Sequence, residues 1–269
     1  MNRQSYSSLV GYKVAAFILN CTAAITAIPI CVIAVTQNFT EVKERMGKVI
    51  VQDYTYKKPI TMIGVEAGIC WGANTSNDEK NYLRGIDCLE SGHGRTFEFP
   101  DVYLTLEGYS ARGIREWYTR IGGLPTRLRA STRYIDYEHG FGYVTPPSIE
   151  GNPEAKEVYE DLMEHIKSYL ESLDTIGVPR EDSALGLPLG METKIVCKHN
   201  MRNLMDMSHQ RMCNRAYHEY RGLFNDVCDA LGNYSEEWKY IVDHYFMPKC
   251  KLMGFCSEKK TCGMMPRKQ

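Results

Sequence analysis

Three stretches of the chain have the alternation of apolar and polar positions that is typical of β-strands. They are residues 47–52, 101–108 (DVYLTLEG) and 191–199 (METKIVCKH). In the second stretch, Val102, Leu104 and Leu106 share one face, which we expect to point into the core.

Other stretches repeat apolar residues at helical spacing. Residues 77–91 place Leu83, Ile86 and Leu89 on one side, and residues 110–121 form a second helix that stops at Gly122 and Gly123. Asn152 and Pro153 start a helix that runs to about residue 174, and Gly177 closes it. Its expected apolar stripe consists of Val158, Leu162, Ile166, Tyr169 and Leu173. Residues 140–153 are expected to be a turn-rich loop, and residues 201–231 the last long helical stretch. Helices and strands alternate without regular βαβ spacing, so the pattern predicts an α+β fold.

Residues 14–35 form an uncharged apolar segment about as long as a membrane-spanning helix. Three interpretations stay open. The segment is a membrane anchor or signal-like sequence, an apolar helix packed on the body, or a non-native extension with Met46 as the natural start. We therefore separate residues 1–46 from a domain that spans residues 47–269.

Composition and charge are those of an ordinary globular protein. Lys plus Arg is 32 and Asp plus Glu is 33, and this balance disfavours a nucleic-acid partner. The ten cysteines do not follow a disulfide-scaffold pattern, so we interpret most as reduced core thiols of a cytoplasmic protein. Any anion site has to be local.

One such site is predicted in residues 122–137 (GGLPTRLRASTRYIDY). Two glycines allow close approach of the backbone to a ligand. Arg127, Arg129 and Arg133 offer planar forks for phosphate, with Thr126 and Ser131 as hydroxyl donors. The plainer alternative is a solvated charged strand or loop. Farther along, Arg211 and Arg215 are spaced i and i+4. The residues alone predict binding of a phosphorylated small molecule.

Four stretches resemble, in order, the motifs of flavin-dependent thymidylate synthases. Residues 91–99 (SGHGRTFEF) are similar to G-H-x-x-x-F-E, and residues 115–134 to R-H-R-x-x-S-x-N-x-x-S-x-R-Y. Residues 177–195 are similar to P-R-E-x-x-R-x-x-L-P, and residues 199–211 to N-x-R-x-L-x-x-F-x-x-x-R. The resemblance covers the chain from residue 47 onward. Within the family, the chain is similar to the branch that ends in a cysteine-bearing tail. It implies one catalytic domain with a mixed or antiparallel sheet packed by long helices.

The resemblance also implies a reaction. NADPH reduces bound FAD, methylenetetrahydrofolate gives its one-carbon unit, and dUMP becomes dTMP. The family has no active-site cysteine nucleophile. An arginine polarises the uracil ring instead, and the resemblance assigns this role to Arg211. The family is homotetrameric with sites shared between subunits, so we expect a homotetramer. Membrane contact is expected only if residues 14–35 form a true anchor.

Further roles follow from the matched motif positions. Ser131 and Arg133 are expected to hold the dUMP phosphate. Contacts to FAD or the folate side are implied for His93, Glu98, Arg120, Asn200 and Arg202. The plainer alternatives are a loop-capping role for His93 and a buried ion pair for Glu98.

The chain also departs from the family's motifs. The R-H-R triplet falls on Thr119, Arg120 and Ile121, and Gly122 and Gly123 are an insertion. Leu128 replaces the signature asparagine, Ala184 an arginine, and Asp206 an asparagine. We expect Arg127, Arg129 and Arg120 to replace the missing cations. Two alternatives stay open, a relative with changed chemistry such as pyrimidine hydroxymethylation and an inactive nucleotide-binding protein.

The tail, residues 248–263, spaces Cys250, Cys256 and Cys262 six residues apart. Zinc sites prefer C-x₂₋₄-C pairs, so the spacing is a weak signal for metal. A metal site, a redox or disulfide role, and plain packing of the tail all stay open.

Overall fold

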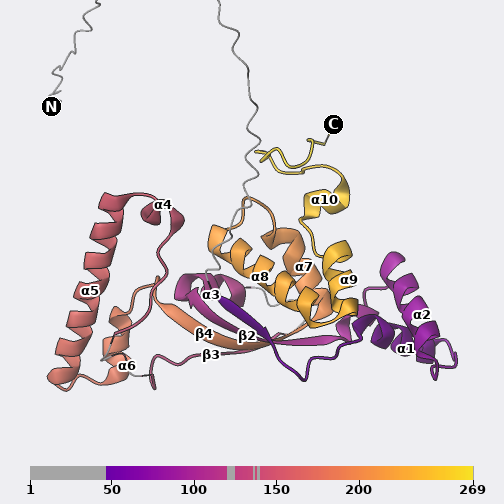
Figure 1. Cartoon of the computed structure of the whole chain (residues 1–269), viewed down its shortest axis with the longest axis horizontal. Coiled ribbons are helices and arrows are strands. Elements are labelled where there is room, and N and C mark those ends of the chain that lie inside the picture. The colour runs from indigo at the N-terminus through magenta and orange to yellow at the C-terminus, as the bar shows by residue number, and fades with distance from the viewer. Residues whose placement is uncertain (1–46, 120–124, 136, 138–139, 269) are drawn as a thin grey trace, which may run out of the picture. The chain divides into compact units, whose positions relative to one another are not determined.

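The fold is built on a four-stranded antiparallel sheet with the order β1-β2-β4-β3 (Figure 1). The computed structural model describes residues 47–119, 125–135, 137 and 140–268. The strands are β1 (Lys48–Val51), β2 (Asp101–Ser110), β3 (Thr126–Arg129) and β4 (Glu192–Asn200). The three strands predicted from alternation are confirmed, and part of the arginine segment forms the edge strand β3.

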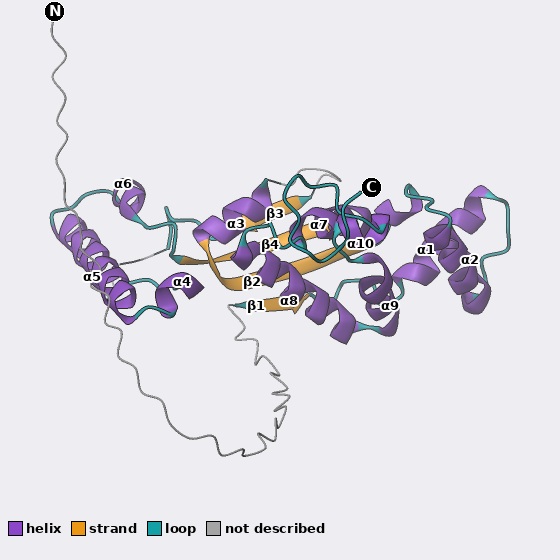
Figure 2. Ribbon diagram, turned by 90° about the horizontal axis from the view of Figure 1, so that it is seen from above, coloured by secondary structure: helices purple, strands orange, loops and turns teal. Residues whose placement is uncertain are grey.

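One face of the sheet is apolar because alternate residues of the strands point the same way. Val102, Leu104 and Leu106 of β2 are fully buried there, as predicted, together with Ile195 of β4. The helices α3 (Ala111–Tyr118), α7 (Met201–Arg211) and α8 (His218–Tyr234) lie over this face (Figures 1 and 2). On the opposite face Val196 and Leu128 are exposed. The sheet therefore has one covered face and one face that the described elements leave open.

The helices α1 (Pro59–Cys70) and α2 (Asp78–Glu90) pack on each other beside the sheet. The helix predicted at 77–91 is confirmed as α2. Glycines let the two backbones approach closely. A Cβ on Gly64 would lie 1.7 Å from the carbonyl oxygen of Asn81, and one on Gly85 2.0 Å from that of Ile60. The predicted stripe was therefore wrong at Leu83, which is exposed.

The long helix α5 (Pro153–Thr175) packs on a second, smaller apolar cluster. Asn152 caps it by accepting a hydrogen bond from the backbone N–H of Ala155, and Gly177 follows its end with a positive φ, as predicted. The buried side was predicted only in part, since Ile166 packs on this cluster as expected. Met163 and Leu170 are buried, whereas Val158, Leu162 and Tyr169 are 68%, 51% and 69% exposed. Because helical positions are 100° apart, these three lie within an arc of about 40°. We call them the α5 stripe.

The last helical stretch is not continuous, so the prediction of one helix over 201–231 was wrong. The chain breaks at residues 212–217, between α7 and α8. The start of α8 is anchored to the end of β2, because the buried carboxylate of Glu219 accepts hydrogen bonds from the Ser110 backbone N–H and hydroxyl. The helix α9 (Glu236–Tyr245) follows and packs on α8.

Short elements complete the described chain. They are η1 (Thr96–Glu98), α4 (Pro147–Glu150), α6 (Arg180–Ser183), η2 (Ala184–Gly186) and α10 (Lys249–Met253). The stretch predicted as a turn-rich loop at 140–153 thus contains the one-turn helix α4. Of the helices described from Pro59 onward, none combines the length and apolar character needed to cross a membrane. Residues 14–35, for which an anchor was one interpretation, lie outside the described residues.

Candidate active site

Arg211 is the last residue of α7, and its guanidinium is held from three sides. It lies over the ring of Tyr220, 4.9 Å from the ring centroid. Its Nη2 donates a hydrogen bond to Thr119 Oγ1 (3.3 Å), and its Nη1 lies 3.9 Å from Glu116 Oε2. A cation at the carboxyl end of a helix is also favoured by the helix dipole. The side chain is 27% exposed, so the fixed cation still reaches solvent.

Arg127 reaches the same end of α3 from β3. Its Nη1 donates to the carbonyl oxygen of Tyr118 (3.1 Å), and its guanidinium lies 5.4 Å from the centre of the Tyr118 ring. Burial lowers the pKa of Arg127, but arginine remains protonated at any physiological pH. The structure therefore brings together two of the predicted site residues, Arg127 and Arg211, around residues 116–119. Arg120, the next residue, lies outside the described residues.

The other two arginines of this segment, Arg129 and Arg133, are exposed. Arg133 Nε donates to Glu181 Oε2 (2.9 Å), and its guanidinium lies over the Tyr134 ring. Ser131 Oγ accepts a hydrogen bond from the Arg133 backbone N–H, and Arg129 is exposed. Arg133 and Glu181 belong to two separate motifs, so this pair joins the R-H-R stretch to the P-R-E stretch.

A second cationic group lies near the start of α7, where three predicted cofactor residues are close in the fold. Glu98 accepts hydrogen bonds from Arg202 Nη1 (2.7 Å) and Arg95 Nη1 (2.9 Å). Partial burial raises the pKa of Glu98, but the hydrogen bonds and charges of the two arginines outweigh this and hold the pKa below its ordinary value. His93 lies in the loop just before η1, with its ring beside Trp71 (6.4 Å between centroids).

Asn200 has a structural position. It is the N-cap of α7, and its side chain accepts a hydrogen bond from the Asn203 backbone N–H (2.8 Å). Its neighbour His199 is fully buried and accepts a hydrogen bond from Trp117 Nε1 (3.0 Å) on Nε2. Because the indole only donates, the proton of a neutral His199 is on Nδ1, which donates to Asn203 Oδ1 (2.5 Å). Burial lowers the pKa of His199 to about 4, the net result after the hydrogen bond to Asn203 raises it and the nearby charge of Arg127 lowers it.

The two cationic groups lie at opposite ends of α7. Arg202 and Arg211 are nine residues apart, which corresponds to about 14 Å along the axis. Nine steps of 100° also turn the second side chain about 180° away from the first. One chain therefore presents the Glu98–Arg202 group and Arg211 in opposite directions.

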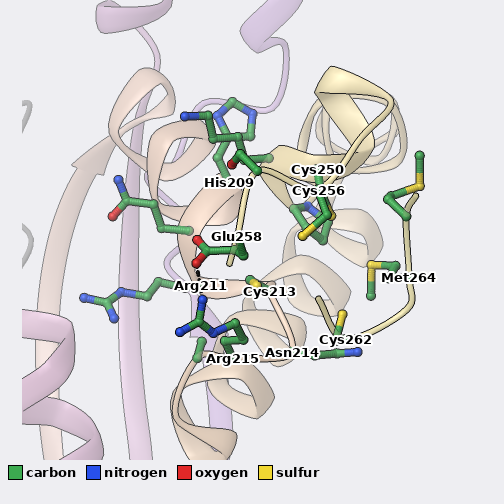
Figure 3. Close-up of a pocket in the computed structure, with 16 residues that line it drawn as sticks. His209, Arg211, Cys213, Asn214, Arg215, Cys250, Cys256, Glu258, Cys262 and Met264 are labelled. Carbon is green, nitrogen blue, oxygen red and sulfur yellow. Dashed lines mark hydrogen bonds and ion pairs between the residues drawn. The ribbon is translucent and has the colours of Figure 1, made fainter. Parts of the chain in front are cut away.

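A pocket of about 340 Å³ lies beside Arg211, between the loop after α7 and the tail (Figure 3). All three tail cysteines, Cys250, Cys256 and Cys262, line it, and so does Cys213. The described cysteines are free thiols. Among the described residues, no three His, Cys, Asp or Glu side chains are arranged to hold a metal ion.

Several residues around these groups were not predicted. Tyr220, Glu116 and Thr119 hold Arg211, Glu181 pairs with Arg133, and Cys213 joins the tail cysteines. Glu116 and Thr119 lie inside the stretch that resembles the signature, so their position was a usable signal. Tyr220 and Cys213 carry no local signal, because only the turn between α7 and α8 brings them to Arg211 and to the tail.

Comparison with known proteins agrees with this arrangement of motifs. The family model of the thymidylate synthase complementing protein matches residues 48–233. The chain is 32% identical over 191 residues to a flavin-dependent thymidylate synthase of Nitratidesulfovibrio vulgaris, covering 67% of this chain and 75% of the relative. It is 28% identical over 227 residues to the protein of that name from Pyrococcus furiosus, covering 80% and 91%. The chain therefore belongs to the thymidylate synthase complementing protein family, which confirms the resemblance to the flavin-dependent thymidylate synthase enzymes found in its motifs.

Proposed function

We propose that the protein converts dUMP to dTMP by reductive methylation, with FAD as the hydride carrier. Methylenetetrahydrofolate would supply the methylene carbon and NADPH the reducing equivalents, so that one CH₂ unit and one hydride make the new methyl group. The printed names of the relatives support thymidylate synthesis with a flavin. The co-substrates come from the motif resemblance.

The observation that carries the proposal is the fixed guanidinium of Arg211. C5 of uracil has to act as a nucleophile toward the methylene carbon, and for this, negative charge must build up on the ring and its carbonyl oxygens. A permanently charged guanidinium that is already held in place stabilises such charge without reorganising. The ring of Tyr220 and Thr119 Oγ1 fix its orientation, and its partial exposure leaves donors accessible to a ligand.

The residues at the start of α7 fit a flavin dinucleotide. Its pyrophosphate requires cations, and Arg95 and Arg202 provide two on an exposed surface. Its planar rings require aromatic neighbours, and the exposed Trp71 lies beside His93 there. We propose that Arg95, Arg202 and His93 hold the cofactor, which when bound supplies hydride. Glu98 would keep both arginines oriented, since each donates to one of its oxygens.

We propose that the dUMP phosphate binds at Arg129, Ser131 and Arg133. The guanidinium of Arg133 is exposed, and its partner Glu181 is an exposed carboxylate that a phosphate can replace. Arg127 is turned toward the end of α3, so its charge would act near the ring of the nucleotide.

We also propose that a second copy of the chain completes each site, as expected for a homotetramer. Arg202 and Arg211 point about 180° apart on one helix, so a ligand that bridges flavin and uracil needs them from different copies. The exposed α5 stripe offers an apolar surface for such a contact.

Release of tritium from C5-labelled dUMP tests the reaction. Protein would be mixed with FAD, NADPH and methylenetetrahydrofolate, and Arg211→Ala compared with Arg215→Ala. Arg215 is the matched control because it lies four residues away and pairs with Glu258. We expect Arg211→Ala to lower folate-dependent release about 100-fold or more and Arg215→Ala to change it little. Equal release by wild type and Arg211→Ala would reject the role of Arg211. No release from wild type with bound flavin and measurable dUMP affinity would reject the synthase reaction.

A further inference from the structure

Four thiols converge on the pocket beside Arg211. Cys213, Cys250, Cys256 and Cys262 are among the 16 residues that line it, whereas the whole chain has ten cysteines in 269 residues. Figure 3 shows Cys213 on the loop after α7 and the other three on the tail that crosses the pocket. The thioether of Met264 also lines this space. This concentration of sulfur is not required by the reaction proposed above.

The start of the tail is attached to the body, because α10 packs on α7. An exposed ion pair joins Arg215 to Glu258, and such pairs contribute about 0–1 kcal/mol. Farther along, the tail also closes on itself, since the Cys256 backbone N–H donates to the carbonyl oxygen of Pro266 (2.7 Å). A covalent link between the tail and the loop after α7 would therefore change how firmly the tail covers the pocket.

The local structure distinguishes the three tail cysteines. Cys250 is in the helix α10, and Cys256 is buried with its backbone in a bridge to Arg267. Cys262 is exposed and lies in a stretch without helix or strand, residues 257–263. The Cα atoms of two cysteines joined by a disulfide are about 4.4–6.8 Å apart. A tail cysteine reaches this separation from Cys213 by movement of the tail. Cys262 can make this movement with the smallest loss of structure, and an external oxidant can reach it.

We propose that Cys213 and Cys262 form a reversible disulfide that fastens the tail beside Arg211. The oxidant is a low-molecular-weight disulfide of the glutathione type. The Cys262 thiolate attacks one of its sulfurs and releases one thiol, leaving a mixed disulfide. The Cys213 thiolate then attacks the Cys262 sulfur and releases the second thiol. Two protein thiols are oxidised to one disulfide, and one small disulfide is reduced to two thiols.

Peptide mapping tests the proposal on the full chain. Reduced protein at low concentration is incubated with glutathione disulfide, its remaining thiols are alkylated, and it is digested with trypsin without reduction. Cleavage after Arg211, Arg215, Lys260 and Arg267 gives residues 212–215 and 261–267, each with one cysteine. We expect these two peptides to be joined, and to separate after dithiothreitol. The readout is chemical, so it does not depend on the proposed enzymatic activity.

The variants are chosen to separate a specific link from general oxidation. Cys213→Ser should reduce the joined peptides to background and leave Cys262 as a mixed disulfide with glutathione. Cys250→Ser should leave the joined peptides unchanged, and the exposed Cys70 on α1 should remain unlinked to either peptide in every sample. The proposal is overturned if Cys262 of the wild type stops at the mixed disulfide or links to another cysteine. It is also overturned if the thiols stay unoxidised because the purified protein holds a metal there.

Discussion

The guanidinium of Arg211 lies 4.9 Å from the centroid of the Tyr220 ring, so the end of α7 and the start of α8 meet at the cation proposed to act on the substrate. Tyr220 is fully buried, so the ring cannot turn aside without moving the core. The turn at residues 212–217 makes this contact, and a continuous helix would have separated the two side chains.

We expect Tyr220→Leu to lower kcat for dUMP conversion about 10-fold, because a cation–π contact contributes about 0.5–2 kcal/mol. Tyr220→Phe keeps the ring and should stay within about threefold of wild type. Tritium release at saturating dUMP measures kcat. Phe224→Leu is the control for loss of a buried ring in the same helix, away from Arg211. If Phe224→Leu lowers kcat as much as Tyr220→Leu, general loosening of the core is the cause.

Arg202→Ala should weaken flavin binding on the order of 10- to 100-fold, the range for loss of one charge-assisted hydrogen bond. The measurement is a fluorescence titration of flavin-free protein with FAD. Arg115→Ala, an exposed arginine on α3, is the control and should bind as wild type does. Equal affinity of both variants would place the flavin elsewhere.

Glu181→Gln and Arg133→Ala should change dUMP affinity in opposite directions. If Arg133 binds the phosphate, removing the charge of Glu181 makes Arg133 available to dUMP. Affinity should then rise about threefold, which corresponds to the free energy of an exposed ion pair. Arg133→Ala should lower affinity about 10-fold. Isothermal titration with dUMP gives both values. If dUMP affinity is unchanged in both variants, the Arg133–Glu181 pair is a surface contact between two motifs and does not bind the phosphate.

Below pH 6.5 the buried His199 should destabilise the fold. Its pKa is about 4 in the folded protein, below the ordinary value of 6.5, so the unfolded chain binds a proton first as pH falls. The contribution of neutral His199 to the free energy of unfolding is fully present above pH 6.5. It is lost as pH falls toward 4, and the total loss is about 3 kcal/mol. Urea unfolding between pH 7.5 and 4.5 should show this loss in wild type and a flatter dependence in His199→Gln. The exposed His165→Gln should follow wild type, and a wild-type slope in His199→Gln would contradict the assignment.

Leu162→Glu should break the assembly into smaller species, because it places a charge in the middle of the α5 stripe. Sedimentation equilibrium measures the size of the assembly, and circular dichroism checks that the variant is folded. Glu160→Ala lies on the opposite side of the same helix and should assemble normally. An unchanged mass for Leu162→Glu would move the interface to another surface, such as the open face of the sheet.

Local patterns predicted most elements but not the sides they bury. Alternation found β1, β2 and β4, and the cap at Asn152 with Gly177 found both ends of α5. The exposed side of α5 was misassigned because the helix has two apolar stripes, and only contact with the second cluster decides which one is buried. On α2 the buried side includes Asn81 and Gly85, which have no large apolar side chain, so hydrophobic spacing pointed to the exposed Leu83.

The predicted site residues are described by the structure except for Arg120, and they fall into separate groups. Glu98, Arg202, Arg133 and Glu181 each lie in a different stretch that resembles a family motif. The ion pairs Glu98–Arg202 and Arg133–Glu181 join these stretches only through tertiary contacts, which the motifs do not describe. The residues that hold Arg211 come from α3 and α8, which are distant in sequence. Short-range spacing has no information on such contacts, and for that reason Tyr220 was missed.

The opposed directions of Arg202 and Arg211 on α7 have a genetic consequence. If each reaction centre takes these two arginines from different copies, an Arg202→Ala chain and an Arg211→Ala chain are defective in complementary halves. Each would have low activity by itself, but when the two are unfolded together and reassembled, some centres receive both intact arginines. Two defective alleles in one cell would then restore thymidylate synthesis, whereas a chain with both substitutions would not contribute to rescue.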